Sequence, residues 1–78
     1  MPTLARTGPY RFFIYSNETE EPPHVHVQRE RFLAKFWLNP VSIASPGRFA
    51  AHELNAIQRL IEARRDLLLE AWHEHLGR

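Results

Sequence analysis

The chain has no cysteine, which excludes disulfide bonds, thiolate metal sites and cysteine nucleophiles together. It also has no apolar run near the roughly 18 residues of a membrane span. The opening stretch, MPTLARTGPY, lacks the apolar core of a signal peptide. We therefore expect a soluble cytoplasmic protein with no membrane partner and no cofactor.

A charge excess of one sign is missing as well. Ten lysines and arginines stand against nine aspartates and glutamates among 78 residues, for a formal net charge of +1. That balance does not by itself indicate nucleic-acid binding, although a weak basic excess lies in residues 1–50. A chain of this length forms one small domain over residues 1–78, so any site should be a shallow surface or groove.

The first half of the chain is typical of β-strands. YRFFIYSN, residues 10–17, is aromatic and β-branched and predicts a first strand. ETEEPP, residues 18–23, has no apolar residue and predicts an exposed loop. VSIA, residues 41–44, predicts a short fourth strand that ends before Pro46 and Gly47.

Between these pieces, HVHVQRERFLAKFWL predicts a hairpin that turns at Arg29-Glu30. In that register Val27 faces Phe32, and His26 faces Leu33. Alternation then divides the side chains between two faces of the sheet. The apolar face holds Val25, Val27, Phe32, Ala34, Phe36 and Leu38. The opposite face holds His24, His26, Gln28, Leu33, Lys35 and Trp37.

The second half predicts about 25 helical residues with one apolar stripe. The stripe consists of Leu54, Ile57, Ile61, Leu68, Trp72 and Leu76. Arg64 and Arg65 fall within or beside it, so either these arginines snorkel or the helix bends or breaks there. The expected fold is α+β, with a small antiparallel sheet of three to four strands packed against a long C-terminal helix, either straight or kinked.

The pair His24 and His26 is the first candidate for chemistry. Residues two apart in a strand point to the same face, so the two imidazoles can act as acid and base or ligate one metal ion. A metal would need a third ligand, and none is spaced so as to force the match. The candidates are His52, His73, His75, Glu18, Glu20 and Glu21. The alternative is that both histidines are ordinary polar residues of a half-exposed strand.

The face that carries the histidines is the second candidate. Its expected members are Arg11, Phe13, Tyr15, His24, His26, Lys35 and Trp37. Aromatic and basic groups on an open sheet suit a surface that stacks bases and contacts phosphates. The same residue types dominate protein-protein hot spots, and Trp37 has the further alternative of packing in the core.

Four ordered segments, YRFFIYSNE, PPHVHV, AKFWLNPV and LLEAWHEHLG, make the chain resemble the DUF4160 family over nearly its whole length. The family motif falls on Phe12, Phe13, Asn17, His24, His26, Lys35, Trp37, Leu38 and Trp72. The chain departs from the family in its ETEE loop and in its Arg-Glu turn, where glycine is more usual. The resemblance implies a small bacterial domain encoded beside a partner in a toxin–antitoxin-like arrangement, with an RNA-directed activity as one outcome.

Three hypotheses follow for function. The first is an interaction module, one component of a toxin–antitoxin-like pair, that binds a small protein encoded nearby or RNA through His24, His26, Lys35 and Trp37. The second is a metal-independent ribonuclease in which the histidines serve as base and acid while Lys35 binds phosphate. The third is a metal-binding regulator that uses both histidines and a carboxylate of ETEE. Whether the chain is effector or silencer, and its oligomeric state, stay open.

Overall fold

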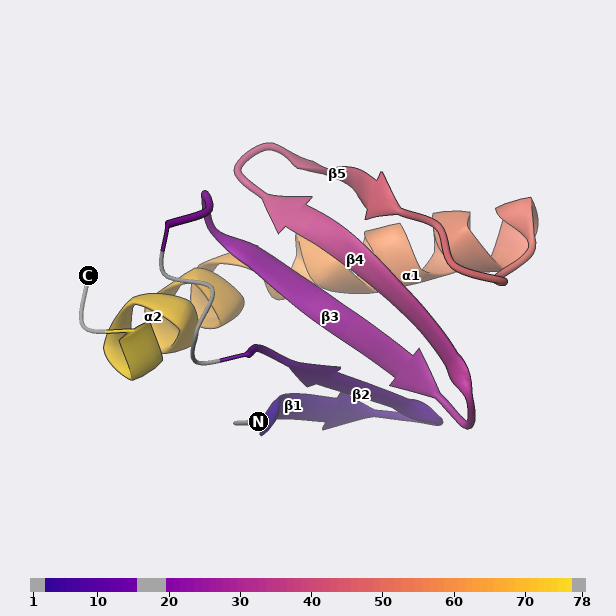
Figure 1. Cartoon of the computed structure of the whole chain (residues 1–78), viewed down its shortest axis with the longest axis horizontal. Helices are drawn as coiled ribbons and strands as arrows, with labels where there is room; N and C mark the ends of the chain where they lie inside the picture. Colours follow the sequence, from indigo (N-terminus) through magenta and orange to yellow (C-terminus); the bar gives the residue numbers. More distant parts are fainter. Residues whose placement is uncertain (1–2, 16–19, 77–78) are drawn as a thin grey trace.

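The computed structural model describes residues 3–15 and 20–76. Within these ranges the chain forms one antiparallel sheet followed by two helices (Figure 1). The strands follow one another in space as they do in sequence, so each pairs with its neighbours along the chain. The elements are β1 (Thr3–Thr7), β2 (Tyr10–Phe13), β3 (His24–Arg29), β4 (Phe32–Leu38), β5 (Val41–Ser45), α1 (Ala51–Ala63) and α2 (Arg65–Leu76).

The α+β class is confirmed, but the sheet has five strands rather than three to four. The strand that sequence reasoning missed is β1, which pairs with β2 across a turn at Gly8-Pro9, with Thr7 opposite Tyr10. The Gly-Pro dipeptide is a turn signal, yet the short mixed stretch TLART alternates too weakly to stand out. The strand expected over residues 10–17 ends at Phe13, and its last two residues lie outside the described ranges.

The hairpin turns at Glu30-Arg31, so the predicted turn at Arg29-Glu30 is wrong by one residue. Glu30 has a positive φ of 55°, a conformation that favours glycine. Because the turn contains no glycine, its position could not be predicted from the residue types. The correct register places His26 opposite Lys35 and His24 opposite Trp37. Each β3 residue thus pairs with a β4 residue two positions beyond the predicted one. Because side chains alternate with a period of two, the assignment of residues to the two faces is unchanged.

Two helices stand where one long helix, straight or kinked, was expected, and of the alternatives at the arginines the structure has the break. The 13-residue α1 ends at Ala63, and Arg64, with a φ of −118° and a ψ of 17°, interrupts the helix before the 12-residue α2. Arg65 donates hydrogen bonds from Nε to the Leu38 carbonyl at 3.0 Å and from Nη2 to Asn39 Oδ1 at 2.7 Å. This arginine therefore ties the helical break to the turn between β4 and β5.

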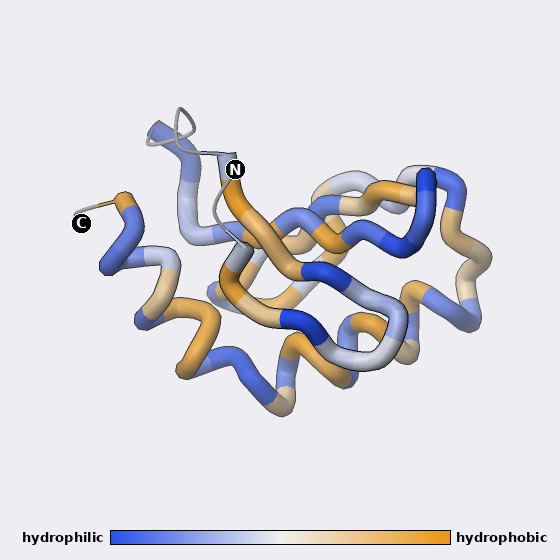
Figure 2. The backbone as a smooth tube through the Cα atoms, turned by 90° about the horizontal axis from the view of Figure 1, so that it is seen from below, coloured by the Kyte–Doolittle hydropathy of each residue, from blue (hydrophilic) through white to orange (hydrophobic). Residues whose placement is uncertain are grey.

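Both helices lie on one side of the sheet (Figures 1 and 2). The predicted apolar face of the hairpin and the helical stripe meet there and form the core. Its buried members are Phe12, Ile14, Val25, Val27, Ala34, Phe36, Leu38, Phe49, Leu54, Ile57, Ile61, Leu68 and Trp72. We call the side away from the helices the outer face.

Candidate functional site

The outer face brings together the residues expected to form the site. Phe13 pairs with His26 across β2 and β3, and His26 pairs with Lys35 across β3 and β4. The neighbouring row consists of Arg11, Gln28 and Leu33 in the same three strands. His24 lies opposite Trp37 at the other end of β3.

Aromatic rings surround the two histidines. The His26 ring stacks on Phe13 at 5.4 Å between centroids and meets the edge of Tyr15 at 4.6 Å. The His24 ring lies 5.4 Å from that of His26 and 6.0 Å from that of Trp37. Such edge and offset contacts are the favourable geometries for aromatic pairs. The outer face thus carries a continuous ring cluster rather than separate polar groups.

Burial corrects the expectation that the histidines lie on an open surface. His24 is fully buried and His26 is 7% exposed. Besides its sheet neighbours, His24 approaches the Trp72 ring of α2 at 6.3 Å, and its Nδ1 donates to the Pro22 carbonyl at 2.9 Å. Because a carbonyl only accepts, this contact requires the proton on Nδ1. The histidines are therefore packed into the fold.

The two cations of the outer face are held by neighbours. Arg11 stacks over Phe13 at 4.5 Å and donates to Thr3 Oγ1 at 2.8 Å and to Gln28 Oε1 at 3.1 Å. Lys35 lies 4.9 Å from the Trp37 ring and forms an ion pair with Glu21. The segment before β3 thus reaches the outer face through its carboxylate, which offsets part of the positive charge there.

The remaining candidate metal ligands do not converge. Residues 3–15 and 20–76 contain no group of three His, Asp or Glu side chains able to hold a metal ion. His52 is exposed at the start of α1 and His75 is exposed near the end of α2. Glu21 is engaged by Lys35, and Glu18 lies outside the described residues.

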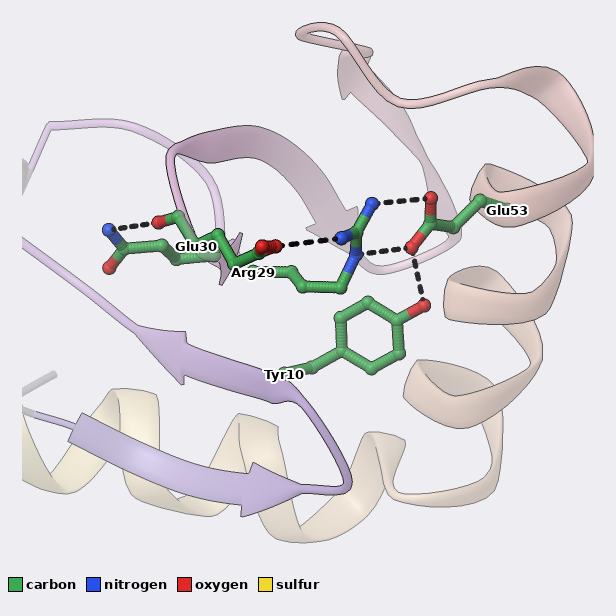
Figure 3. A network of polar contacts seen from close by, with 5 residues as sticks. Tyr10, Arg29, Glu30 and Glu53 are labelled. Atoms are coloured by element: carbon green, nitrogen blue, oxygen red, sulfur yellow. Dashed lines mark hydrogen bonds and ion pairs between the residues drawn. The ribbon is translucent and has the colours of Figure 1, made fainter.

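A second polar cluster, which sequence reasoning missed, joins the sheet to α1 (Figure 3). Glu53 accepts two hydrogen bonds from Arg29, from Nε at 2.7 Å and from Nη2 at 3.0 Å. The Tyr10 hydroxyl donates to the same carboxylate at 2.7 Å. These residues come from β2, β3 and α1, so no local spacing signals their meeting. The planar two-bond pairing fixes the first turn of α1 against the sheet.

This cluster shifts the protonation of all three groups. Partial burial, followed by the hydrogen bond to Glu53, raises the pKa of the Tyr10 hydroxyl. The hydrogen bond from Arg29 and then that from Tyr10 lower the pKa of the Glu53 carboxyl. The hydrogen bond to Glu53 raises the pKa of Arg29. At neutral pH these shifts favour a protonated Tyr10 hydroxyl, a charged Arg29 and an ionised Glu53 carboxylate.

We expect the free energy of unfolding to fall at both pH extremes because of this cluster. A raised Tyr10 pKa stabilises the fold below about pH 10 and loses that contribution as pH rises through the raised value. A lowered Glu53 pKa stabilises the fold above about pH 4 and loses that contribution as pH falls.

Urea unfolding across pH, with Tyr10→Phe and Glu53→Gln measured beside the native chain, separates the two contributions. Tyr10→Phe should flatten the alkaline loss, and Glu53→Gln should flatten the acid loss. Native-like alkaline loss in Tyr10→Phe would assign that loss to other groups.

The DUF4160 family, described as a domain of unknown function, matches residues 10–73 through its sequence model. The chain belongs to the DUF4160 family. The matched range includes β2 through most of α2, and with them every residue of the outer-face cluster. No curated protein and no solved structure matches this DUF4160 chain. In its described part, no helix is long and apolar enough to cross a membrane.

Proposed function

We propose that this DUF4160 domain is an interaction module, one component of a toxin–antitoxin-like pair, whose partner protein binds the outer face. The observation that supports the proposal is the arrangement of the layers. Both helices cover the other side of the sheet, which leaves a face of aromatic, cationic and aliphatic side chains without a helix over it (Figure 1).

The accessible part of this face has the composition of a protein interface. Tyr15 and Trp37 are half-buried, and Leu33, nearer the hairpin turn of the same face, is 40% exposed. Tyrosine, tryptophan and arginine are the types that dominate protein hot spots. The rings of Tyr15 and Trp37 already contact neighbouring rings, so little side-chain entropy is lost when a partner binds.

A protein partner fits the charges better than RNA does. Phosphate binding depends on several uncompensated cations, and affinity grows with the number of phosphates neutralised. On the outer face Lys35 is paired with Glu21, and Arg11 is bonded to Thr3 and Gln28. The remaining positive charge is small for an RNA surface.

Hydrolysis of RNA by the histidines has less support, because catalytic groups must reach the proton that they transfer. With His24 fully buried and His26 nearly so, a 2′-hydroxyl has no direct access to either ring. The same burial, together with the lack of a third convergent ligand among the described residues, gives the metal-binding alternative little support.

Leu33→Arg tests the proposal. The substitution places a charge on the exposed part of the outer face, so affinity for the small protein encoded beside this chain should fall at least about tenfold. Leu67→Arg is the matched control, since Leu67 is 69% exposed on α2. Titration calorimetry of co-purified partner measures both. Equal affinity of Leu33→Arg and the native chain would remove the outer face as the binding surface.

A further inference from the structure

A groove of about 490 Å³ lies beside the outer-face cluster, between the segment Glu20–Pro23 and the end of α2. Its size is within the range of ligand-binding pockets. It is lined by Glu20, Glu21, Pro22, Pro23, Trp72 and His73. Neither the family nor the function proposed above assigns a role to it.

Trp72 lines this groove and carries a buried hydrogen-bond donor without a partner among the described residues. The side chain is only 2% exposed, and its indole Nε1 has no hydrogen-bond partner among the described residues. Buried indole N–H groups usually find an acceptor, because leaving one unpaired is unfavourable. An occupant that presents an acceptor to Trp72 would satisfy this group.

Besides Trp72, the groove is lined by two glutamates, by His73 and by two prolines that supply no backbone donor. Pro22 and Pro23 have no N–H, and their carbonyls already accept from His24 Nδ1 and from the Leu38 amide. Glu20 is exposed and has no ion pair within the described residues, while Glu21 is held by Lys35. The exposed carboxylate of Glu20 repels phosphate or carboxylate and attracts a cation.

We propose that this groove binds an extended basic segment of a protein. A backbone carbonyl of the segment accepts from Trp72 Nε1, and an arginine or lysine of the segment pairs with Glu20. The aliphatic stem of that cation lies along Pro22 and Pro23, as long basic side chains do on apolar surfaces. The groove borders the outer face through Glu21, Pro22 and Trp72, but its test substitutes neither Leu33 nor Leu67.

The experiment follows the two indole N–H resonances of the ¹⁵N-labelled chain, assigned with Trp37→Phe. The probe is a capped peptide, Ala-Arg-Ala-Arg-Ala, and the matched peptide replaces both arginines with glutamate. The Trp72 Nε1–H resonance should move downfield with the arginine peptide, and the Trp37 resonance should stay in place. Glu20→Gln should weaken binding about three- to fivefold, as expected for an exposed ion pair, whereas Glu62→Gln on α1 should leave binding unchanged.

Three results would overturn the inference. They are no movement of the Trp72 resonance, equal movement with the glutamate peptide, and full affinity of Glu20→Gln. None of them bears on Leu33→Arg, so failure of the groove and failure of the outer face are distinguishable.

Discussion

Gly47→Ala should destabilise this domain by about 2–5 kcal/mol, whereas Gly8→Ala should cost only about 1–2 kcal/mol. Both glycines have a positive φ, 60° for Gly47 and 57° for Gly8, so an alanine is strained at either position. Only Gly47 is also crowded. A Cβ there would lie 1.8 Å from the Leu33 carbonyl oxygen, while a Cβ at Gly8 meets nothing within 4 Å.

Urea unfolding of the two variants and the native chain measures the difference. A domain of this length has about 4–12 kcal/mol of total stability, so Gly47→Ala removes a large part of it. A Gly47→Ala chain that fails to fold beside a folded Gly8→Ala chain agrees with the expected ranking. Equal losses in both variants would mean that the approach of Gly47 to β4 is unimportant.

The alternation of side chains predicted the faces of the sheet but not its register. Val25 and Val27 are buried against the helices, and His24 and His26 point to the other side, as their period of two indicates. The register depended on the turn, and Glu30 occupies a glycine-like conformation. A rule based on turn composition cannot find such a residue, because tertiary pairing compensates for its strain.

A bend or break of the helix was one of two predicted alternatives, because two charged residues interrupted an apolar stripe. What Arg65 contacts was not predictable, since Leu38 and Asn39 lie in a turn distant in sequence. The same limit applies to the cluster of Tyr10, Arg29 and Glu53, whose members meet only in the folded chain.

For the candidate site, the alternation of side chains along neighbouring strands was sufficient to predict which residues share the outer face. The burial of these residues could not be predicted in the same way, because the groups that enclose His24 come from the Pro22 segment and from Trp72 of α2. A strand pattern reports which way a side chain points, and not whether another part of the chain covers it. The hypotheses of a catalytic or metal-binding pair depended on that missing information.

His24→Ala should therefore lower the free energy of unfolding by about 3 kcal/mol, as loss of a large buried side chain does. The change empties space between the rings of His26, Trp37 and Trp72, and it leaves the Pro22 carbonyl without the donor that His24 supplies. Chemical denaturation monitored by circular dichroism measures the loss.

His75→Ala is the matched control, because His75 is exposed on α2 and its removal should change stability by less than about 0.5 kcal/mol. A His24→Ala chain as stable as the control would mean that the ring contributes little to packing, and a chemical role for the pair would regain support. A loss near the expected value makes His24 part of the structure that supports the outer face. The partner would then bind to groups that His24 holds in place, chiefly Trp37, rather than to His24 itself.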